Sequence, residues 1–256
     1  MKYKNFAYLF TASLIFLFLS CASKKDYIYF QHTNEIPDVA RQHDMANYEL
    51  KIIPNDNLLI TVSALNPQAA EPFNAINLDR GLTSNIEWQG YLVDESGNIN
   101  FPIIGKVHLA GLTKDEAILS IEKKVSEYIE NPVINIRFLN YKVSILGEVK
   151  APGAYIIKDE KVTLPEALAL AGDMTIYGNR HDVMLCRVVN GEKQFHLIDM
   201  TSPEVFFSPY YYLQQNDIVY VQPTSSRVRN SDFNPYISIF ISSVSLILTA
   251  VTLFTK

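Results

Sequence analysis

The chain carries one local pattern twice, and this repetition limits the folds that it can adopt. The run "PNDNLLITV", from Pro54 to Val62, is echoed by "QQNDIVYVQ", from Gln214 to Gln222. In each, an Asn-Asp pair suited to a turn leads into an alternating, β-rich strand. A T-x-x-E capping box that begins a helix also occurs twice, at Thr113 and at Thr163. The order of these signals predicts two small α+β units, each with a few strands packed on one helix.

Turn residues mark the connections inside both units. Asp56 belongs to the first Asn-Asp turn, and Gly97 lies in "DESGN", which is predicted to join two strands of a hairpin. Pro152 and Gly153 fit the second and third positions of a type II turn, in which glycine takes a positive φ. Gly172 follows the second helix, where it is placed to end it.

The first residues have the pattern of an export signal. A basic start precedes an apolar run from Phe6 to Leu19, which ends in "FLSC". That ending resembles a bacterial lipoprotein signal, in which cleavage leaves a lipid-bearing cysteine, here Cys21, as the first residue of the mature chain. An uncleaved anchor helix is the alternative. The polar stretch that follows is predicted to be a tether with a short ordered patch around residues 27–30.

The chain has two cysteines, and this number agrees with a lipid anchor. If Cys21 carries lipid, Cys186 has no partner within the chain, so the exported part is not held together by disulfides. Cys186 lies in the apolar run "DVMLCRVV" and is predicted to be a small buried residue of a strand.

The last residues, "YISIFISSVSLILTAVTLFTK", form an apolar run that contains regularly spaced hydroxyls. A helix from Tyr236 to Phe254 would measure roughly 28 Å, near the thickness of a hydrocarbon core. Five of its hydroxyl-bearing residues share an arc of roughly 80°. They are Ser238, Ser242, Ser245, Thr249 and Thr252.

This hydroxyl stripe has three possible roles. A lone tail anchor leaves the stripe unexplained, a seam between helices uses small residues for close approach, and a pore-lining face turns the hydroxyls toward water. The last two require an oligomer, and the water-facing role is favoured because the stripe is uninterrupted. The hydroxyls should also weaken retention in the inner membrane during export.

The composition argues against several classes of function. The net charge is −5 with dispersed basic residues, so no nucleic-acid footprint is present. The five histidines are scattered without metal-ligand spacing, and no catalytic or cofactor-binding motif occurs. We therefore expect no enzyme, no metal and no cofactor. The tyrosines at 210–212 could stack on sugar rings, although a packing role in strands is the stronger interpretation.

Longer runs identify a family resemblance. The runs "YELKIIPNDNLLITV", "GYLVDESGNINFPIIGKVHLAGLTKDEA" and "NPVINIRF" resemble the polysaccharide export domain of outer-membrane capsule and exopolysaccharide export lipoproteins. The runs "VSILGEVKAPGAYIIKDEKVTLPEALALAGDMT" and "LQQNDIVYV" resemble the soluble-ligand-binding β-grasp (SLBB) domain that follows it. Two positions depart from the family pattern: Asn55 stands where a glycine is usual, and Asp173 stands where a second glycine is usual.

The resemblance implies an α+β fold with two small domains and a terminal helix. The expected organisation is a lipoprotein signal peptide at 1–20, an N-terminal tether at 21–47, a polysaccharide export domain at 48–139, an SLBB β-grasp domain at 140–222, a linker at 223–234 and a C-terminal transmembrane amphipathic helix at 235–255. One β-grasp unit is evident, whereas some relatives have two or more.

The resemblance also implies a role. The chain is expected to be a channel subunit that exports capsular or extracellular polysaccharide, built into a ring-shaped homo-oligomer. Its expected place is the outer membrane of a Gram-negative-type bacterium, lipid-anchored at Cys21, with its domains in the periplasm. By analogy, its inner-membrane partner is a polysaccharide co-polymerase with tyrosine-kinase-like activity. The alternative is an outer-membrane lipoprotein that binds polysaccharide or a partner without forming a pore.

Overall fold

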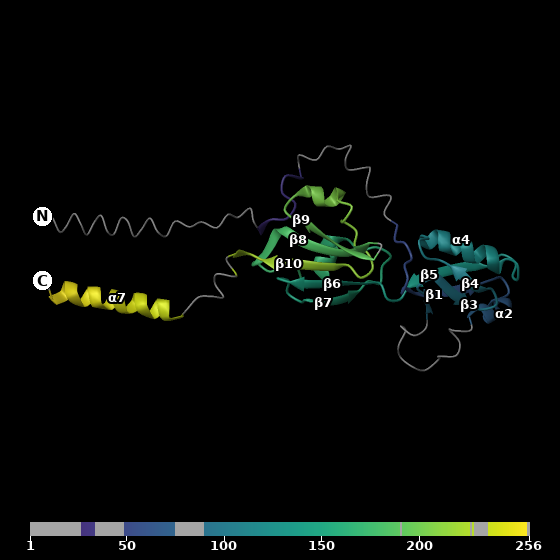
Figure 1. The fold of residues 1–256 in the computed structure, drawn as a ribbon, viewed down its shortest axis with the longest axis horizontal. Helices are drawn as coiled ribbons and strands as arrows, with labels where there is room; N and C mark the ends of the chain where they lie inside the picture. Colours follow the sequence, from purple (N-terminus) through teal and green to yellow (C-terminus); the bar gives the residue numbers. More distant parts are fainter. Residues whose placement is uncertain are drawn as a thin grey trace.

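A computed structural model describes residues 27–33, 49–74, 90–189, 191–225, 227 and 235–254 (Figure 1). The predicted signal peptide, Cys21 and most of the predicted linker lie outside these residues. The described elements are β1 (Asn57–Ser63), α2 (Pro67–Ala70), η4 (Glu71–Asn74), β2 (Tyr91–Leu92), β3 (Asn98–Phe101), β4 (Gly105–His108), α4 (Lys114–Val125), β5 (Val133–Phe138), β6 (Lys142–Gly147), β7 (Gly153–Ile156), α5 (Leu164–Leu170), β8 (Gly178–Val189), β9 (Glu192–Ile198), η6 (Pro203–Phe207), β10 (Ile218–Pro223) and α7 (Pro235–Phe254).

The first domain is built from residues 49–138 around one buried apolar cluster. Its main sheet has the antiparallel order β2-β1-β5, and β3 and β4 form a separate two-stranded sheet. The helix α4 buries Ala117, Ile121 and Val125, which recur at helical spacing on one face. These side chains pack into the same core as Ile134 and Ile136 of β5. The predicted α+β character of this part is therefore found.

The second domain, residues 141–223, has a larger sheet and a core of its own. The strand order is β7-β6-β10-β8-β9, in which β10 pairs parallel to β6 and the other neighbours are antiparallel. The short helix α5 covers one face of this sheet and buries Leu164, Ala167 and Leu168. Cys186 lies on β8 and is 9% exposed, so the prediction of a buried strand cysteine is confirmed.

Asn140 joins the two domains. Its Oδ1 accepts a hydrogen bond from the Asn57 amide at 2.8 Å, and its Nδ2 donates to the Asn55 carbonyl at 2.8 Å. Phe138, just before it, packs against both cores, and an ion pair links Lys114 at the start of α4 to Glu160 of the second domain. The connection is therefore short and held by direct contacts.

Both helices begin with the predicted capping boxes. The hydroxyl of Thr113 accepts from the Glu116 amide, and the Glu116 carboxylate accepts from the Thr113 amide. Thr163 and Glu166 make the same reciprocal pair. Each box satisfies two amides that would otherwise lack partners at the start of a helix.

The two Asn-Asp turns also have the same geometry. Asn55 and Asn216 have positive φ values of 71° and 65°, and each is followed by an almost fully buried aspartate. The carboxylate of Asp56 accepts from the Ile53 amide at 2.9 Å, and that of Asp217 accepts from the Gln214 amide at 2.7 Å. The sequence echo therefore corresponds to one turn that is built twice.

The surroundings of the two aspartates differ in charge. Asp217 pairs with buried Arg187, whose Nη2 lies 2.7 Å from Asp217 Oδ2 and also donates to the Tyr212 carbonyl at 2.9 Å. Asp56 has no cation beside it among the described residues, and its Oδ1 is buried without a hydrogen-bond partner there. Burial therefore raises the pKa of Asp56 to about 7.

Two turn predictions need correction. The "DESGN" turn forms around Gly97, which has φ 79°, but the strands on either side of it do not make a hairpin. Instead, β2 pairs with β1, and β3 pairs with β4. Gly153 does not take the positive φ of a type II turn, because it is the first residue of β7 and pairs with Ile145. The positive φ in this region belongs to Gly147, at 89°, where a Cβ would lie 2.0 Å from the Val221 carbonyl oxygen.

The C-terminal helix α7 lies beyond the second domain, on the side away from the first domain (Figure 1). Its apolar side chains that the structure describes are exposed, among them Phe240 and Leu246. Within the described residues, no helix combines the length and the apolar character that a membrane crossing needs. The predicted helix is therefore present, whereas its predicted membrane crossing is not supported by the structure.

The Arg187–Asp217 pair yields a stability prediction. Arg187→Met should destabilise the second domain by about 3–5 kcal/mol, because it leaves the buried Asp217 carboxylate uncompensated. Arg137→Met changes an exposed arginine of β5 and should stay within about 0.5 kcal/mol of wild type. Urea unfolding of each variant, monitored by amide exchange in β8 and β10, measures the change in the free energy of unfolding. Equal midpoints for the two variants would contradict the prediction.

The raised pKa of Asp56 predicts a pH dependence. Its folded-state pKa of about 7 lies above the usual value near 3.9 for an unfolded chain. The contribution of protonated Asp56 to the free energy of unfolding is therefore fully present below about pH 4. It is lost as the pH rises through about 7. Asp56→Asn keeps an acceptor for the Ile53 amide. It should remove this part of the dependence of the free energy of unfolding on pH.

Urea unfolding of the first domain at pH 5, 6, 7 and 8 checks this prediction. Asp94→Asn is the matched control, because Asp94 is an exposed turn aspartate of the same domain and its replacement should keep the wild-type slope. A wild-type slope that persists in Asp56→Asn would show that another group causes the pH dependence.

Candidate functional site

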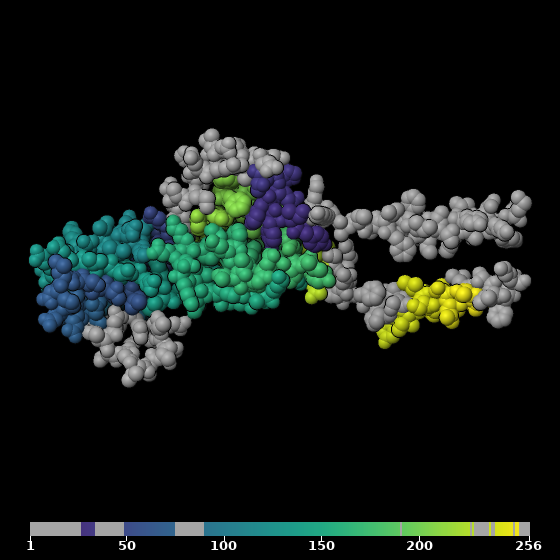
Figure 2. Space-filling model, turned by 180° about the vertical axis from the view of Figure 1, so that it is seen from behind, coloured from purple at the N-terminus to yellow at the C-terminus, as the bar shows by residue number. Residues whose placement is uncertain are grey.

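The N-terminal segment, residues 27–33, docks on the second domain although the first domain follows it in the chain. The Phe30 amide donates to the Met200 carbonyl at 3.1 Å, and the Gln31 amide donates to the Thr201 carbonyl at 2.6 Å. Figure 2 shows the segment, in purple, on the surface of the second domain. The patch predicted around residues 27–30 is thus part of a longer contact that only the folded chain brings together.

Tyr29 makes the most specific contact of this segment. Its hydroxyl donates to Asp173 Oδ1 at 2.5 Å, and the Arg180 guanidinium lies over its ring at 4.9 Å. Burial and the hydrogen bond to Asp173 raise the pKa of Tyr29. Asp173 itself has a φ of 73°, so the aspartate takes the left-handed conformation that a glycine would adopt easily and also supplies an acceptor.

Phe30 provides the apolar part of the contact. Its ring lies 4.7 Å from the Phe206 ring, and both rings pack against the core of the second domain. Tyr29 lies beside Phe30, with 5.6 Å between the ring centroids. The segment therefore covers part of the core that η6 and α5 leave open, and aromatic area is an efficient means of doing so.

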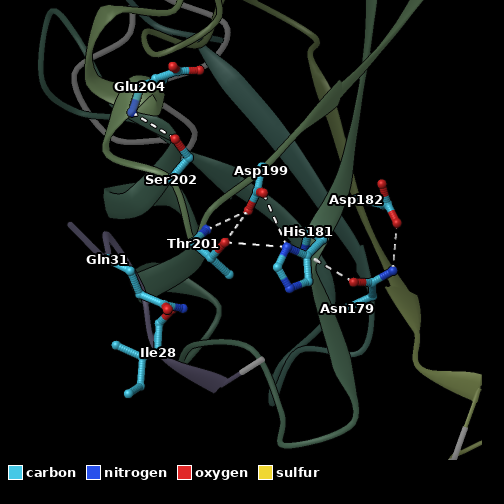
Figure 3. Close-up of polar contacts among 9 residues, drawn as sticks. All are labelled: Ile28, Gln31, Asn179, His181, Asp182, Asp199, Thr201, Ser202 and Glu204. Carbon is cyan, nitrogen blue, oxygen red and sulfur yellow. Dashed lines mark hydrogen bonds and ion pairs between the residues drawn. The ribbon is translucent and has the colours of Figure 1, made fainter. Parts of the chain in front are cut away.

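A polar network holds the turn that receives the segment (Figure 3). Asp199 Oδ1 accepts from the Thr201 amide at 2.7 Å and from the Thr201 hydroxyl at 2.6 Å. Asp199 Oδ2 lies 3.1 Å from His181 Nδ1, and Asn179 accepts from the His181 amide. Burial alone would raise the pKa of Asp199, but the hydrogen bonds from Thr201 and His181 outweigh it and hold that pKa below its usual value.

This network does not have the geometry of a nucleophilic catalyst. In a Ser-His-Asp relay, the nucleophile and the carboxylate meet opposite nitrogens of the histidine ring. Here the Thr201 hydroxyl, at 3.3 Å, and Asp199, at 3.1 Å, both lie next to His181 Nδ1. Among the described residues, no group of three or more His, Cys, Asp or Glu side chains is placed to hold a metal ion.

The tyrosines at 210–212 pack against the second core, but they lie between η6 and β10 and not in a strand, where the sequence interpretation placed them. Tyr211 is buried, whereas Tyr210 stacks on His196 with 3.9 Å between the ring centroids. Lys161 lies over the Tyr212 ring at 5.9 Å. Because the rings of Tyr210 and Tyr212 already make these contacts, packing is their stronger role.

The hydroxyl stripe lies on α7, and three of its members have described side chains. Ser242, Ser245 and Thr249 are all exposed. The Thr249 hydroxyl donates to the Ser245 carbonyl at 2.8 Å, so this polar group is satisfied by its own helix. Ser238 and Thr252 also belong to α7, but their side chains lie outside the description.

Docking of the segment predicts a protection pattern. Phe30→Ala should raise amide exchange at residues 30 and 31 about tenfold or more, the factor that a loss of roughly 1.4 kcal/mol gives. Tyr27→Ala changes an exposed aromatic of the same segment and should leave this exchange unchanged. Hydrogen exchange read by mass spectrometry compares them, and equal exchange in the two variants would contradict the role of Phe30.

Comparison with known proteins places both domains. Residues 44–139 match the family described as polysaccharide biosynthesis/export protein, and residues 141–221 match the SLBB domain. The chain is 35% identical over 111 residues to the EPS I polysaccharide export outer membrane protein EpsA of Ralstonia solanacearum. It is 37% identical over 112 residues to the protein of the same name from Ralstonia nicotianae. Each match covers 42% of this chain and 29% of the relative.

The resemblance predicted from the sequence runs is thus confirmed by two adjoining domain matches and by the relatives. The chain spans less than a third of the length of these relatives. Its two domains nevertheless occur in the order that the resemblance implied. The chain therefore carries a region of the polysaccharide biosynthesis/export protein family at residues 44–139, followed by an SLBB domain at residues 141–221.

Proposed function

We propose that this protein is a channel subunit that exports capsular or extracellular polysaccharide across the outer membrane. The observation that carries the proposal is the adjoining pair of matches, a polysaccharide biosynthesis/export domain followed by an SLBB domain. The names of the two relatives, which include polysaccharide export and the outer membrane, support the same role. In this proposal the chain is a positioning and conducting component and not an enzyme.

The proposal includes a lipid anchor on Cys21 and an orientation of the two domains. The six residue-to-residue steps from Cys21 to Tyr27 can span at most roughly 20 Å. Because the N-terminal segment docks on the second domain, an anchored Cys21 would hold that domain close to the membrane. The first domain would then extend into the periplasm, toward an inner-membrane co-polymerase partner of the tyrosine-kinase-like type.

In the proposed assembly, α7 serves as the membrane segment of a ring of copies. The support comes from its exposed apolar side chains and its place next to the second domain. The hydroxyls of the stripe would face water or a neighbouring helix. Satisfaction of the Thr249 hydroxyl by the Ser245 carbonyl reduces the cost of placing it in an apolar surrounding.

The first test of the proposal removes α7. A chain that ends at residue 234 keeps both domains and the predicted anchor, and it should lose surface polysaccharide by at least tenfold if α7 forms the membrane channel. Polysaccharide on the cell surface is measured in a strain that lacks the native protein, with the full-length chain as control and with periplasmic protein levels compared. Normal export by the shortened chain would favour the alternative, a binding lipoprotein that forms no pore.

The second test locates the stripe. In a Cys186→Ser background, Ser242→Cys, Ser245→Cys and Thr249→Cys should react with a water-soluble thiol reagent in cells. Phe240→Cys and Ile247→Cys, on the opposite side of the helix at about 100° per residue, should stay protected. Gel-shift labelling measures the reaction. Equal protection of both sets would contradict a water-facing stripe.

A further inference from the structure

Within the residues that the structure describes, no helix covers one face of the five-stranded sheet of the second domain. Along each strand, side chains alternate between the core and the opposite side. The core-facing residues pack under α5, and the others form what is here called the outer face. Large apolar side chains of this face are 37–63% exposed. They are Leu146, Val188, Phe195, Leu197 and Ile218.

The strand register joins these side chains into continuous rows. One row runs Phe195, Cys186, Ile218, because Phe195 pairs with Cys186 and Cys186 pairs with Ile218. The adjacent row runs Leu197, Met184, Tyr220, Leu146. Directly opposite residues in neighbouring strands lie side by side on one face, so the apolar surface crosses four of the five strands without a break.

The first domain shows that such a face is not a general property of this chain. The corresponding outward positions of β5 include Asn135 and Arg137, and Thr61 of β1 pairs with Asn135. These polar residues suit a sheet face in water. Val133 and Leu92 are also exposed at outward positions of that sheet, so its face is mixed, whereas the apolar rows of the second domain are continuous.

A complementary concave surface lies at the other edge of the same sheet. A groove of about 790 Å³ runs between the end of β7 and the exposed side of α5. Leu170, which is 51% exposed, Ala169 and Ile156 supply apolar lining. The lining also includes the charged residues Lys158, Asp159, Lys161 and Glu166. In the strand order, β7 stands at one edge and β9, with Phe195 and Leu197, stands at the other.

We infer that the outer face around Phe195 and Leu197 docks into the β7–α5 groove of a second copy of this chain. The two surfaces differ and lie at opposite edges of the sheet, so the contact is head-to-tail and repeats from copy to copy, which is the geometry that closes rings. This inference rests on the proposed function, since it supplies the contact between ring subunits.

The available area matches a second copy. Five large apolar side chains, each about half exposed, offer on the order of 400 Å². With the groove of the neighbour counted, the contact approaches about 1,000 Å², the lower limit for a specific interface. A single chain rarely leaves a continuous apolar patch of that size in water. In this contact, α5 of the neighbouring copy covers the outer face. The domain's own α5 packs only on the opposite face of the sheet.

The first test uses two leucines of nearly equal exposure. Leu197→Lys places a charge in the interface and should weaken association of the detergent-extracted full chain by about tenfold or more. Leu119→Lys makes the same change on α4, where the leucine is 64% exposed against 63% for Leu197. It should leave association unchanged. Native gels across a concentration series measure both, and equal assembly by the two variants would overturn the inference.

The second test fixes the direction of the contact. In a Cys186→Ser background, copies that carry Leu197→Cys are mixed with copies that carry Leu170→Cys under mild oxidation. A disulfide that forms in the mixture, and in neither variant alone, supports the head-to-tail contact. A disulfide between two Leu197→Cys copies would show a face-to-face pair and would overturn it. Absence of any disulfide in assemblies that persist would overturn it as well.

The outcome for this contact is separable from that for the proposed function. If the wild-type chain restores surface polysaccharide but stays monomeric, the docking inference fails and export stands. If the chain assembles through positions 197 and 170 but restores no polysaccharide, the contact stands and the proposed function fails.

Discussion

A sheet has two faces, and in the second domain one short helix is available to cover them. The helix α5 has seven residues and buries three of them, so it shields only part of one face of a five-stranded sheet. The rest of that core is closed by other parts of the chain: the tyrosines at 210–212, η6 and the N-terminal segment. The opposite face keeps its apolar rows exposed. The docking of the N-terminal segment and the exposure of the outer face thus have one cause: α5 is too short to cover the sheet.

The attachment of the N-terminal segment also gives meaning to one departure from the family pattern. Asp173 stands where a glycine is usual and adopts the positive φ that glycine would take. In exchange for this strain, the chain gains a carboxylate that accepts from the Tyr29 hydroxyl, 144 residues away in sequence. The residue that departs from the family pattern is therefore the acceptor of a long-range contact.

The parts of the fold that could be predicted are those determined by neighbours in sequence. Both capping boxes and both Asn-Asp turns depend on hydrogen bonds between residues three apart, so the residue types are sufficient to indicate them. The error at Gly153 has the opposite origin. Pro-Gly is compatible with a type II turn, but pairing with Ile145 keeps Gly153 in a strand, and the close approach of Val221 instead requires a glycine at Gly147. Nothing local to either glycine reports these contacts.

The sequence by itself determined two α+β units, their helix starts, their matched turns and a family resemblance, because each rests on short-range chemistry or on the order of such signals. Only the tertiary structure decided which environment each repeated turn would have. Asp217 meets Arg187 across the sheet, whereas Asp56 is buried without a cation among the described residues. It also decided that Phe195 and Leu197 continue one apolar surface with Ile218 and Leu146, since strand order and register bring these distant residues together. Local hydrogen bonds can be read from neighbouring residues, but a surface exists only after the strands have paired.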